Sequence, residues 1–260
     1  EVFHQRCDVR EPEQVEALIA AAMERFGTIH GWINNAAGNF ISPTEALSPR
    51  AFDVERIRAD FPILSRQVNG KPLVYLDNGA SAQKPRAVID AVTQAYSMEY
   101  ANVHRGLHYL SNLATEKYEA VRGIVGRFLN ADPEEIVFNS GTTEGINLVS
   151  YGWAAPRLGP GDEIVLSIME HHANIVPWHF LRERQGVVLK WVDVDAKGDL
   201  DPQAVLDAIG PKTKLVAVTQ MSNVLGTVVD VAAICRGARE KGVPVLVDGS
   251  QAAEIGRAHV

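Results

Sequence analysis

The sequence predicts an α/β fold in which helices cover both faces of a mainly parallel sheet. From about residue 135 onward, short apolar runs of strand length alternate with segments of helical periodicity. Several of these runs, such as Val243–Val247, are apolar without interruption, which is typical of strands buried on both faces of a parallel sheet. Polar residues follow where the runs end, at the edge where open α/β sheets bind ligands.

The first 52 residues predict a separate βαβ unit, with a helix that stops near Gly27 and a strand over Ile29–Ala36. Through Cys7-Asp8-Val9 and Asn34–Gly38 this segment resembles the short-chain dehydrogenase/reductase family. It holds neither a Gly-rich dinucleotide fingerprint nor a tyrosine followed four positions later by lysine. We therefore expect a reductase fragment, loosely attached through a helix that spans Phe52, and keep an NAD(P)-dependent reductase as an alternative function.

The next stretch predicts short elements joined by polar loops. Ser48-Pro49 is a good start for a helix that runs through Phe52 to Asp60, and Asn69-Gly70 is a tight-turn signal. A strand is expected after this turn, and two helices with apolar faces follow it. The predicted ranges are Leu73–Leu76 for the strand, and Arg86–Tyr96 and Glu116–Leu129 for the helices.

Residues 135–253 predict the repeated strand–helix units of the parallel sheet. The expected strands are Glu135–Phe138, Glu163–Ser167, Val187–Val194, Leu215–Thr219 and Val243–Val247. The expected helices are one that opens at Gly141–Gly145, then Pro177–Glu183, Pro202–Ile209 and Val231–Lys241.

Composition and charge restrict the classes of partner. The net charge of −7 and the pI near 5.6 argue against an electrostatic grip on nucleic acid or an anionic membrane. The two cysteines, Cys7 and Cys235, lie far apart and form no metal or redox motif, so a reducing, cytoplasmic compartment is expected. No apolar run is long enough to span a bilayer.

Thr142 and Thr143 lie between a predicted strand and a predicted helix, directly after Gly141. Backbone N–H groups and two hydroxyls would converge there on an anion, most plausibly phosphate. The equally weighted alternative is a simple helix cap, with Ser140 or Thr142 as the cap residue and Glu144 near the third position.

His171 follows the next predicted strand, where a neutral imidazole could stack on a flat ring or move a proton. A satisfied polar histidine is the ordinary alternative. A metal site with His172 and His179 is disfavoured, because no cysteine or closely spaced carboxylate completes a zinc-like ligand pattern, and we predict no metal.

Asp248 closes the strand that begins at Val243. A carboxylate at such a strand end can hold a pyridine nitrogen in its protonated form, although an Asp that merely caps the next turn is also common. Asn223 and Gln251 likewise follow strand ends. The joint pattern of polar groups after consecutive strands is far less frequent by chance than any single part.

From about Asp53 to Ala253 the chain closely resembles the aspartate-aminotransferase-like, fold type I pyridoxal-phosphate enzymes. Within them it is similar to the cysteine desulfurase/selenocysteine lyase family, in the SUF-type branch that serves iron–sulfur cluster assembly. The motifs are Tyr75-Leu-Asp-Asn, Asn102-Val-His-Arg-Gly, Gly141-Thr-Thr-Glu-Gly-Ile-Asn, Glu170-His-His-Ala-Asn-Ile-Val-Pro-Trp, Ser222-Asn-Val-Leu-Gly and Val247-Asp-Gly-Ser-Gln-Ala.

This resemblance implies pyridoxal 5'-phosphate as the cofactor and assigns a role to each residue. The family converts L-cysteine (or L-selenocysteine) to alanine and leaves a persulfide on an enzyme cysteine. It acts as a homodimer and passes sulfur to an acceptor protein. The implied contacts are phosphate for Thr142 and Thr143, the ring face for His171, the ring nitrogen for Asp248, the ring's hydroxyl edge for Asn223 and Gln251, and the substrate mouth for His104 and Arg105.

The chain departs from the family in two residues that the chemistry requires. No lysine follows Asp248 to carry the cofactor, and the nucleophilic cysteine is absent. Cys235 lies in a predicted amphipathic helix, where a buried structural thiol is expected. We therefore expect a fragment of the domain over residues 53–253, a non-native tail over 254–260 and no turnover. A non-catalytic phosphate-ligand-binding protein is a further alternative.

Overall fold

The computed structural model describes Ala17, Ala20, Ala21 and residues 53–253. The three alanines are helical, as the sequence predicts for this region. The predicted strand Ile29–Ala36, the rest of the reductase-like segment and the expected tail at 254–260 lie outside the described residues. The chain divides into two compact units, residues 1–114 and 115–260.

The first unit begins with a short helix and a small hairpin. Helix α2 (Val54–Ala59) is capped by Asp53, whose carboxylate accepts the Arg56 N–H at 3.0 Å. Asp53 has extended backbone angles, so α2 begins after it and does not run continuously from Phe52 as predicted. The predicted start at Ser48-Pro49 lies outside the described residues. After the 3₁₀ turn η2 (Pro62–Ser65), strands β1 (Gln67–Val68) and β2 (Lys71–Pro72) pair around Asn69-Gly70.

The hairpin confirms the predicted turn but not the strand after it. Asn69 and Gly70 both have positive φ angles, 53° and 75°, as a tight two-residue hairpin turn requires. The predicted strand Leu73–Leu76 is wrong: pairing stops at the two residues of β2, and the next residues join no ladder in the described chain.

Two helices follow, and the second is longer than the sequence predicts. Helix α3 (Arg86–Gln94) continues as the π-turn η3 (Ala95–Glu99). Helix α4 (Tyr109–Leu129) begins seven residues before the predicted start at Glu116. Its first turn is supported by His108, whose Nδ1 accepts the Ser111 N–H at 3.4 Å, so a histidine takes the place of the usual capping residues.

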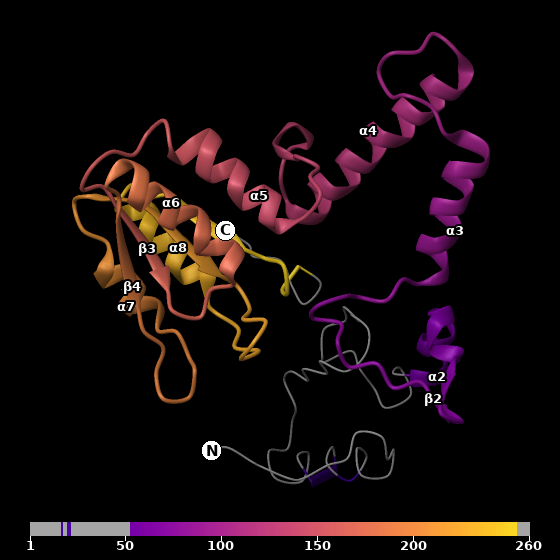
Figure 1. The fold of residues 1–260 in the computed structure, drawn as a ribbon, viewed down its shortest axis with the longest axis horizontal. Coiled ribbons are helices and arrows are strands. Elements are labelled where there is room, and N and C mark those ends of the chain that lie inside the picture. The colour runs from indigo at the N-terminus through magenta and orange to yellow at the C-terminus, as the bar shows by residue number, and fades with distance from the viewer. Residues whose placement is uncertain (1–16, 18–19, 22–52, 254–260) are drawn as a thin grey trace. The chain divides into compact units, whose positions relative to one another are not determined.

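The second unit contains a four-stranded parallel sheet, which confirms the predicted fold class (Figure 1). Its spatial order is β4-β3-β5-β6, and the strands are β3 (Glu163–Ser167), β4 (Val188–Val192), β5 (Thr213–Thr219) and β6 (Val245–Asp248). The predicted strand Glu135–Phe138 is wrong. The 3₁₀ turn η4 (Pro133–Glu135), closed by a capping box from Asp132, occupies its start, and the remainder pairs with no strand in the described part.

Helices connect the strands of the second unit close to their predicted positions. They begin and end where polar or glycine residues satisfy their free backbone groups: Asp201 and Asp230 accept N–H groups at two starts, and Gly186, with φ 72°, ends another. The helical elements are α5 (Thr142–Leu148), η5 (Val149–Ala154), η6 (His172–Asn174), α6 (Val176–Gln185), α7 (Pro202–Ala208) and α8 (Val231–Glu240).

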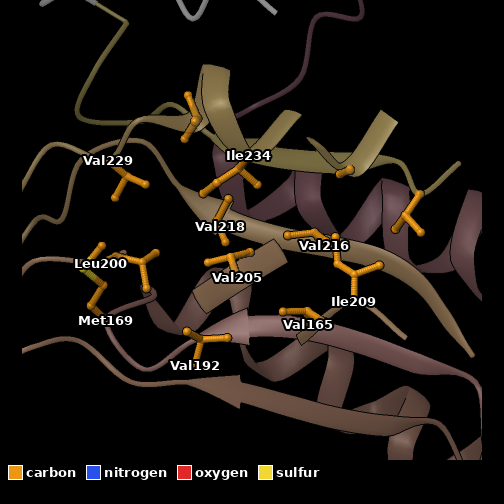
Figure 2. Packing of buried hydrophobic residues seen from close by; sticks show 13 residues of the cluster. Val165, Met169, Val192, Leu200, Val205, Ile209, Val216, Val218, Val229 and Ile234 are labelled. Atoms are coloured by element: carbon orange, nitrogen blue, oxygen red, sulfur yellow. The ribbon is translucent and has the colours of Figure 1, made fainter. Parts of the chain in front are cut away.

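Alternate residues of the sheet pack against helices on opposite faces. Val165 of β3 and Val218 of β5 point toward Val205 of α7 and Ile234 of α8, and all four are fully buried (Figure 2). The larger cluster around them includes Met169, Val192, Leu200, Ile209, Val216, Val229, Val231, Ala238 and Val243. Helices α7 and α8 therefore cover one face of the sheet.

The intervening residues of β3 and β5 point to the opposite face of the sheet. Ile164 and Leu166 of β3, with Leu215 of β5, pack against Trp178 of α6 and Ile146 of α5. The prediction of helices on both faces is thus confirmed. Because both faces are covered, the sheet edge at the carboxyl ends of the strands is where polar groups can meet a ligand.

In the described part of the chain, no helix combines the length and apolar character needed to cross a membrane.

Candidate cofactor site

Asp248 ends β6 as predicted, and its side chain is 5% exposed. Its neighbour in the ladder is Thr219, the last residue of β5. The Gln220 N–H donates to the Asp248 carbonyl at 2.9 Å, so the chain after β5 is fixed against the end of β6. The carboxyl ends of these two strands therefore form one edge, with a buried carboxylate in it.

The turn after β6 orients the Asp248 carboxylate. The backbone N–H of Ser250 donates to Asp248 Oδ1 at 3.0 Å. A carboxylate offers about four acceptor positions, so this contact leaves the group able to accept a hydrogen bond from a protonated pyridine nitrogen. The same turn places Gln251 half-buried and Ala252 buried.

Ser250 also joins this turn to the predicted phosphate-binding threonines. Its Oγ donates to Thr142 Oγ1 at 2.6 Å, across 108 positions of sequence. The structure thus brings Thr142 and Asp248 to the same place, and Thr143 follows Thr142 in the first turn of α5. Ser250 is a site residue that the sequence reasoning missed.

The start of α5 differs from the predicted simple cap. Gly141, with φ 146° and ψ 172°, occupies the cap position without a side-chain hydrogen bond. Glu144 accepts hydrogen bonds from the backbone N–H (2.7 Å) and the hydroxyl of Ser140. These bonds hold the pKa of Glu144 below its ordinary value, so the carboxylate stays ionised. Thr142 therefore does not serve as the cap, and its hydroxyl belongs to the contact with Ser250.

Space above Gly141 is open. A Cβ added to this glycine would meet no atom within 4 Å, and its φ lies in the region that favours glycine over residues with side chains. An anion can therefore come close to this backbone, as the sequence predicts for Gly141-Thr142-Thr143.

His171 is exposed at the start of η6, the turn after β3. Its Nδ1 accepts the Ala173 N–H at 3.1 Å, which fixes the orientation of the ring. The His172 ring lies edge-on at 6.1 Å, whereas His179 contacts Trp191 at 6.0 Å between ring centroids. Among the described residues no group of three or more His, Cys, Asp or Glu could hold a metal ion.

Asn223 lies on a tight turn after β5. Ser222 Oγ accepts the N–H groups of Val224 and Leu225 at 3.3 and 3.1 Å, and Gly226 closes the turn with a positive φ of 72°. The exposed Asn223 side chain is therefore presented by a well-ordered hydrogen-bonded turn.

His104 and Arg105 are exposed residues of the first unit, in the loop before α4. The loop is tied together by Ser111, whose Oγ accepts the Gly106 N–H at 2.9 Å and donates to the Asn102 carbonyl at 2.7 Å. The role of His104 and Arg105 at a substrate mouth stays a prediction.

A buried polar network beneath His171 was not predicted from the sequence. Glu170 accepts hydrogen bonds from Ser167 Oγ at 2.5 Å and from Asn174 Nδ2 at 2.8 Å. Asn174 Oδ1 in turn accepts the Trp178 Nε1–H at 3.0 Å. Asn174 and Trp178 are fully buried, and Glu170 is 7% exposed. The spacing of four between Glu170, Asn174 and Trp178 is the signal that could have identified this network.

Burial raises the pKa of Glu170 above its ordinary value of 4.5. Hydrogen bonds from Ser167, Asn174 and the Thr219 backbone act in the opposite direction, and the negative charge of Asp248 raises the pKa further. The folded chain therefore holds this proton more tightly than the unfolded chain does.

The raised pKa of Glu170 predicts how stability depends on pH. Its contribution to the free energy of unfolding is fully present below pH 4.5 and is lost as the pH rises through the raised value. We expect the stability of Glu170→Gln relative to the unsubstituted chain to increase as the pH rises from 4 to 7. Urea denaturation of both proteins at pH 4, 5.5 and 7 measures this difference. A difference that is independent of pH would contradict the raised pKa.

Cys235 is a buried thiol of α8, as predicted. Burial raises its pKa above the ordinary value of 9.0, although Arg239 and Arg236 oppose the shift, so the group stays a thiol and not a thiolate. In a Cys7→Ser background, we expect Cys235 to react with a colorimetric disulfide reagent on the order of 100-fold more slowly in the folded chain than in denaturant. Equal rates would show that the thiol is accessible.

Comparison with known proteins gives the family to which the chain belongs. Residues 74–260 match the model of the aminotransferase class-V family, and the chain belongs to that family. The match begins at residue 74 and gives no support to the predicted reductase-like segment, which stays a prediction.

The similar curated proteins are cysteine desulfurases. The chain is 53% identical over 202 residues to the cysteine desulfurase of Klebsiella pneumoniae (strain 342), covering 77% of this chain and 50% of the relative. It is 50% identical over 210 residues to the probable cysteine desulfurase of Xylella fastidiosa (strain Temecula1), covering 81% of this chain and 50% of that protein. The chain thus spans about half the length of the curated relatives it matches.

The similar solved structures include cysteine desulfurases and the cystine C–S lyase C-DES. The apo cysteine desulfurase from Thermococcus onnurineus NA1 has a TM-score of 0.72 and 38% identity, over 77% of this chain and 48% of that one. The cysteine desulfurase CsdA from Escherichia coli has a TM-score of 0.66 and 38% identity, over 78% of this chain and 50% of that one. A C-DES variant with glycine covalently linked to its PLP cofactor has a TM-score of 0.61 and 25% identity, over 75% of this chain and 50% of that one.

Proposed function

We propose that these residues form the cofactor-binding half of a pyridoxal-phosphate-dependent cysteine desulfurase. The observation that carries this proposal is the hydrogen bond between Ser250 and Thr142, because it joins the predicted phosphate-binding threonines to the turn that orients Asp248. The desulfurase relatives support this assignment, and the PLP-linked structural neighbour, C-DES, supports pyridoxal phosphate as the cofactor.

The residues present fit the cofactor's non-covalent contacts. The open approach at Gly141 and the hydroxyls of Thr142 and Thr143 suit a phosphate group. The buried Asp248 carboxylate suits a protonated pyridine nitrogen, and the fixed ring of His171 suits stacking. Asn223 and Gln251 would bond along the ring's hydroxyl edge. Pyridoxal phosphate, when bound, supplies an electron sink for an amino-acid substrate that loses its α-proton.

Substrate and partners follow from the same proposal. L-cysteine, or L-selenocysteine, would be the substrate, alanine the product, and a protein thiol the first sulfur acceptor. A homodimer, a sulfur acceptor protein and a cytoplasmic location belong to the proposal through the family resemblance.

Titration of the 260-residue chain with pyridoxal phosphate, followed by tryptophan fluorescence, tests the proposal. We expect saturable binding, at least about tenfold weaker in Asp248→Asn and in Thr142→Ala/Thr143→Ala, because each removes a contact of about 1.4 kcal/mol or more. Asp207→Asn is the matched control, since Asp207 is exposed on α7, where it accepts a hydrogen bond from Gln203.

A parallel titration with NADPH distinguishes the alternative functions. Binding of NADPH without binding of pyridoxal phosphate would favour the reductase alternative. Binding of inorganic phosphate and pyridoxal phosphate with equal affinity would favour a simple phosphate-ligand site.

A further inference from the structure

We propose that Glu170 is a positioning residue that holds His171 and Asp248 in place at the ligand-binding edge of the sheet. The expected effect on cofactor binding rests on the proposed function. The positioning of the two side chains rests on the hydrogen bonds around Glu170. The hydrogen-bond partners of the Glu170 side chain are Ser167 and Asn174, and neither is a predicted cofactor-binding residue. Its effect is therefore exerted through its neighbours.

The first set of contacts joins Glu170 to the element that carries His171. Ser167, the last residue of β3, donates to one carboxyl oxygen of Glu170, and Asn174, the last residue of η6, donates to the other. The turn between these two residues contains His171. Since Asn174 is itself held by the fully buried Trp178, the turn is anchored in the core beneath α6.

The second set of contacts joins Glu170 to the neighbouring strand. The backbone N–H of Thr219, the last residue of β5, lies close enough to the Glu170 carboxyl group to oppose the rise in its pKa. Thr219 is the ladder neighbour of Asp248, and its Oγ1 donates to the Met221 carbonyl at 2.9 Å. The Glu170 carboxyl group therefore lies at the ends of β3 and β5, where β6 presents Asp248.

Two side-chain donors on one buried carboxyl group demand an acceptor at that position. An apolar side chain would leave the Ser167 hydroxyl and the Asn174 amide without this partner, and buried donors without partners are costly. A structural role alone would explain a loss of stability on substitution. A positioning role predicts in addition that the two neighbouring site side chains lose their fixed orientation.

Two backbone amides report that orientation without any ligand. The Ala173 N–H is bonded to the ring of His171, and the Ser250 N–H is bonded to the carboxylate of Asp248. Hydrogen exchange at these two amides, measured by NMR, therefore follows the two side chains separately from global unfolding.

The test compares Glu170→Ala with Glu163→Ala. Glu163 is the first residue of the same strand β3; its Oε2 accepts Thr213 Oγ1 at 3.0 Å and pairs with Lys190 at 3.5 Å, at the opposite edge of the sheet. We expect Glu170→Ala to speed exchange at Ala173 and Ser250 at least tenfold and to weaken pyridoxal phosphate binding about tenfold. Glu163→Ala is expected to change neither. Glu170→Gln, which keeps the shape and one acceptor, should lie between the unsubstituted chain and Glu170→Ala, and it decides the question if Glu170→Ala does not fold.

Unchanged exchange at both amides in the Glu170 variants would overturn the proposal, as would equal changes in the Glu163 variant. If the unsubstituted chain binds no pyridoxal phosphate, the proposed function fails, but the exchange measurement still decides the role of Glu170.

Discussion

A polypeptide of these 260 residues, saturated with pyridoxal phosphate and L-cysteine, is expected to form alanine no faster than free cofactor does. The family chemistry needs a lysine that carries the cofactor and a thiolate that takes the sulfur. No lysine occurs after Lys241, and Cys235 is buried with a raised pKa. Binding at Asp248 and Thr142 would therefore proceed without turnover.

Alanine formation and protein persulfide are the quantities to measure, with borohydride reduction to locate any pyridoxyl-lysine. As the matched positive control, the chain is joined after Ala253 to the corresponding remainder of the Klebsiella pneumoniae relative. We expect this chimera to gain activity over the background by several orders of magnitude, within the range that enzymes achieve. Catalytic alanine formation by the 260 residues alone, or stoichiometric trapping at one lysine, would contradict the account.

Among single substitutions in the buried network around Glu170, replacement of Trp178 by Ala is expected to be the most destabilising. It should lower the free energy of unfolding by about 3–5 kcal/mol. Trp178 is fully buried between α6 and the sheet, and its indole N–H satisfies Asn174. Truncation opens a cavity and leaves the Asn174 carbonyl oxygen without that donor.

Urea denaturation measures the free energy of unfolding of Trp178→Ala, and two further variants serve as comparisons. Trp191→Ala, at a tryptophan that is 41% exposed on β4, should cost about 1 kcal/mol or less. Trp178→Phe keeps most of the packing and removes the donor, so it should cost about 1–3 kcal/mol. Equal losses for Trp178→Ala and Trp191→Ala would show that Trp178 does not anchor the core.

The parallel sheet could be predicted because its strands carry their own signal. Strand Thr213–Thr219 is buried at every position except Lys214, strand Val245–Asp248 is buried or half-buried throughout, and each contains an uninterrupted apolar run, Leu215–Val218 or Val245–Val247. Leu73–Leu76 and Glu135–Phe138 have the same local character, but a strand also needs a neighbour to pair with. Pairing depends on distant residues, and in the described chain neither segment has a strand partner.

The sequence predicts the site residues that follow the strands, but not Glu170 and Ser250, which support them. Asp248 ends a strand of the parallel sheet and His171 follows another, so their place at one edge follows from parallel pairing. The run before Thr142 pairs with no strand in the described residues, and Thr142 reaches this edge through its hydrogen bond with Ser250. Glu170 was missed because a glutamate beside two histidines is typical of a solvated surface, and its burial depends on Asn174 and Thr219 in the folded chain. Ser250 was missed because its partner Thr142 is 108 positions away.

A crystal structure of the chain with pyridoxal phosphate would test the cofactor assignment most directly. The account predicts phosphate oxygens within hydrogen-bond distance of Thr142 and Thr143, and the pyridine nitrogen within hydrogen-bond distance of Asp248. It also predicts that the His171 ring lies against the pyridine. A cofactor bound away from Asp248, or with its phosphate remote from both threonines, would contradict the assignment of this site.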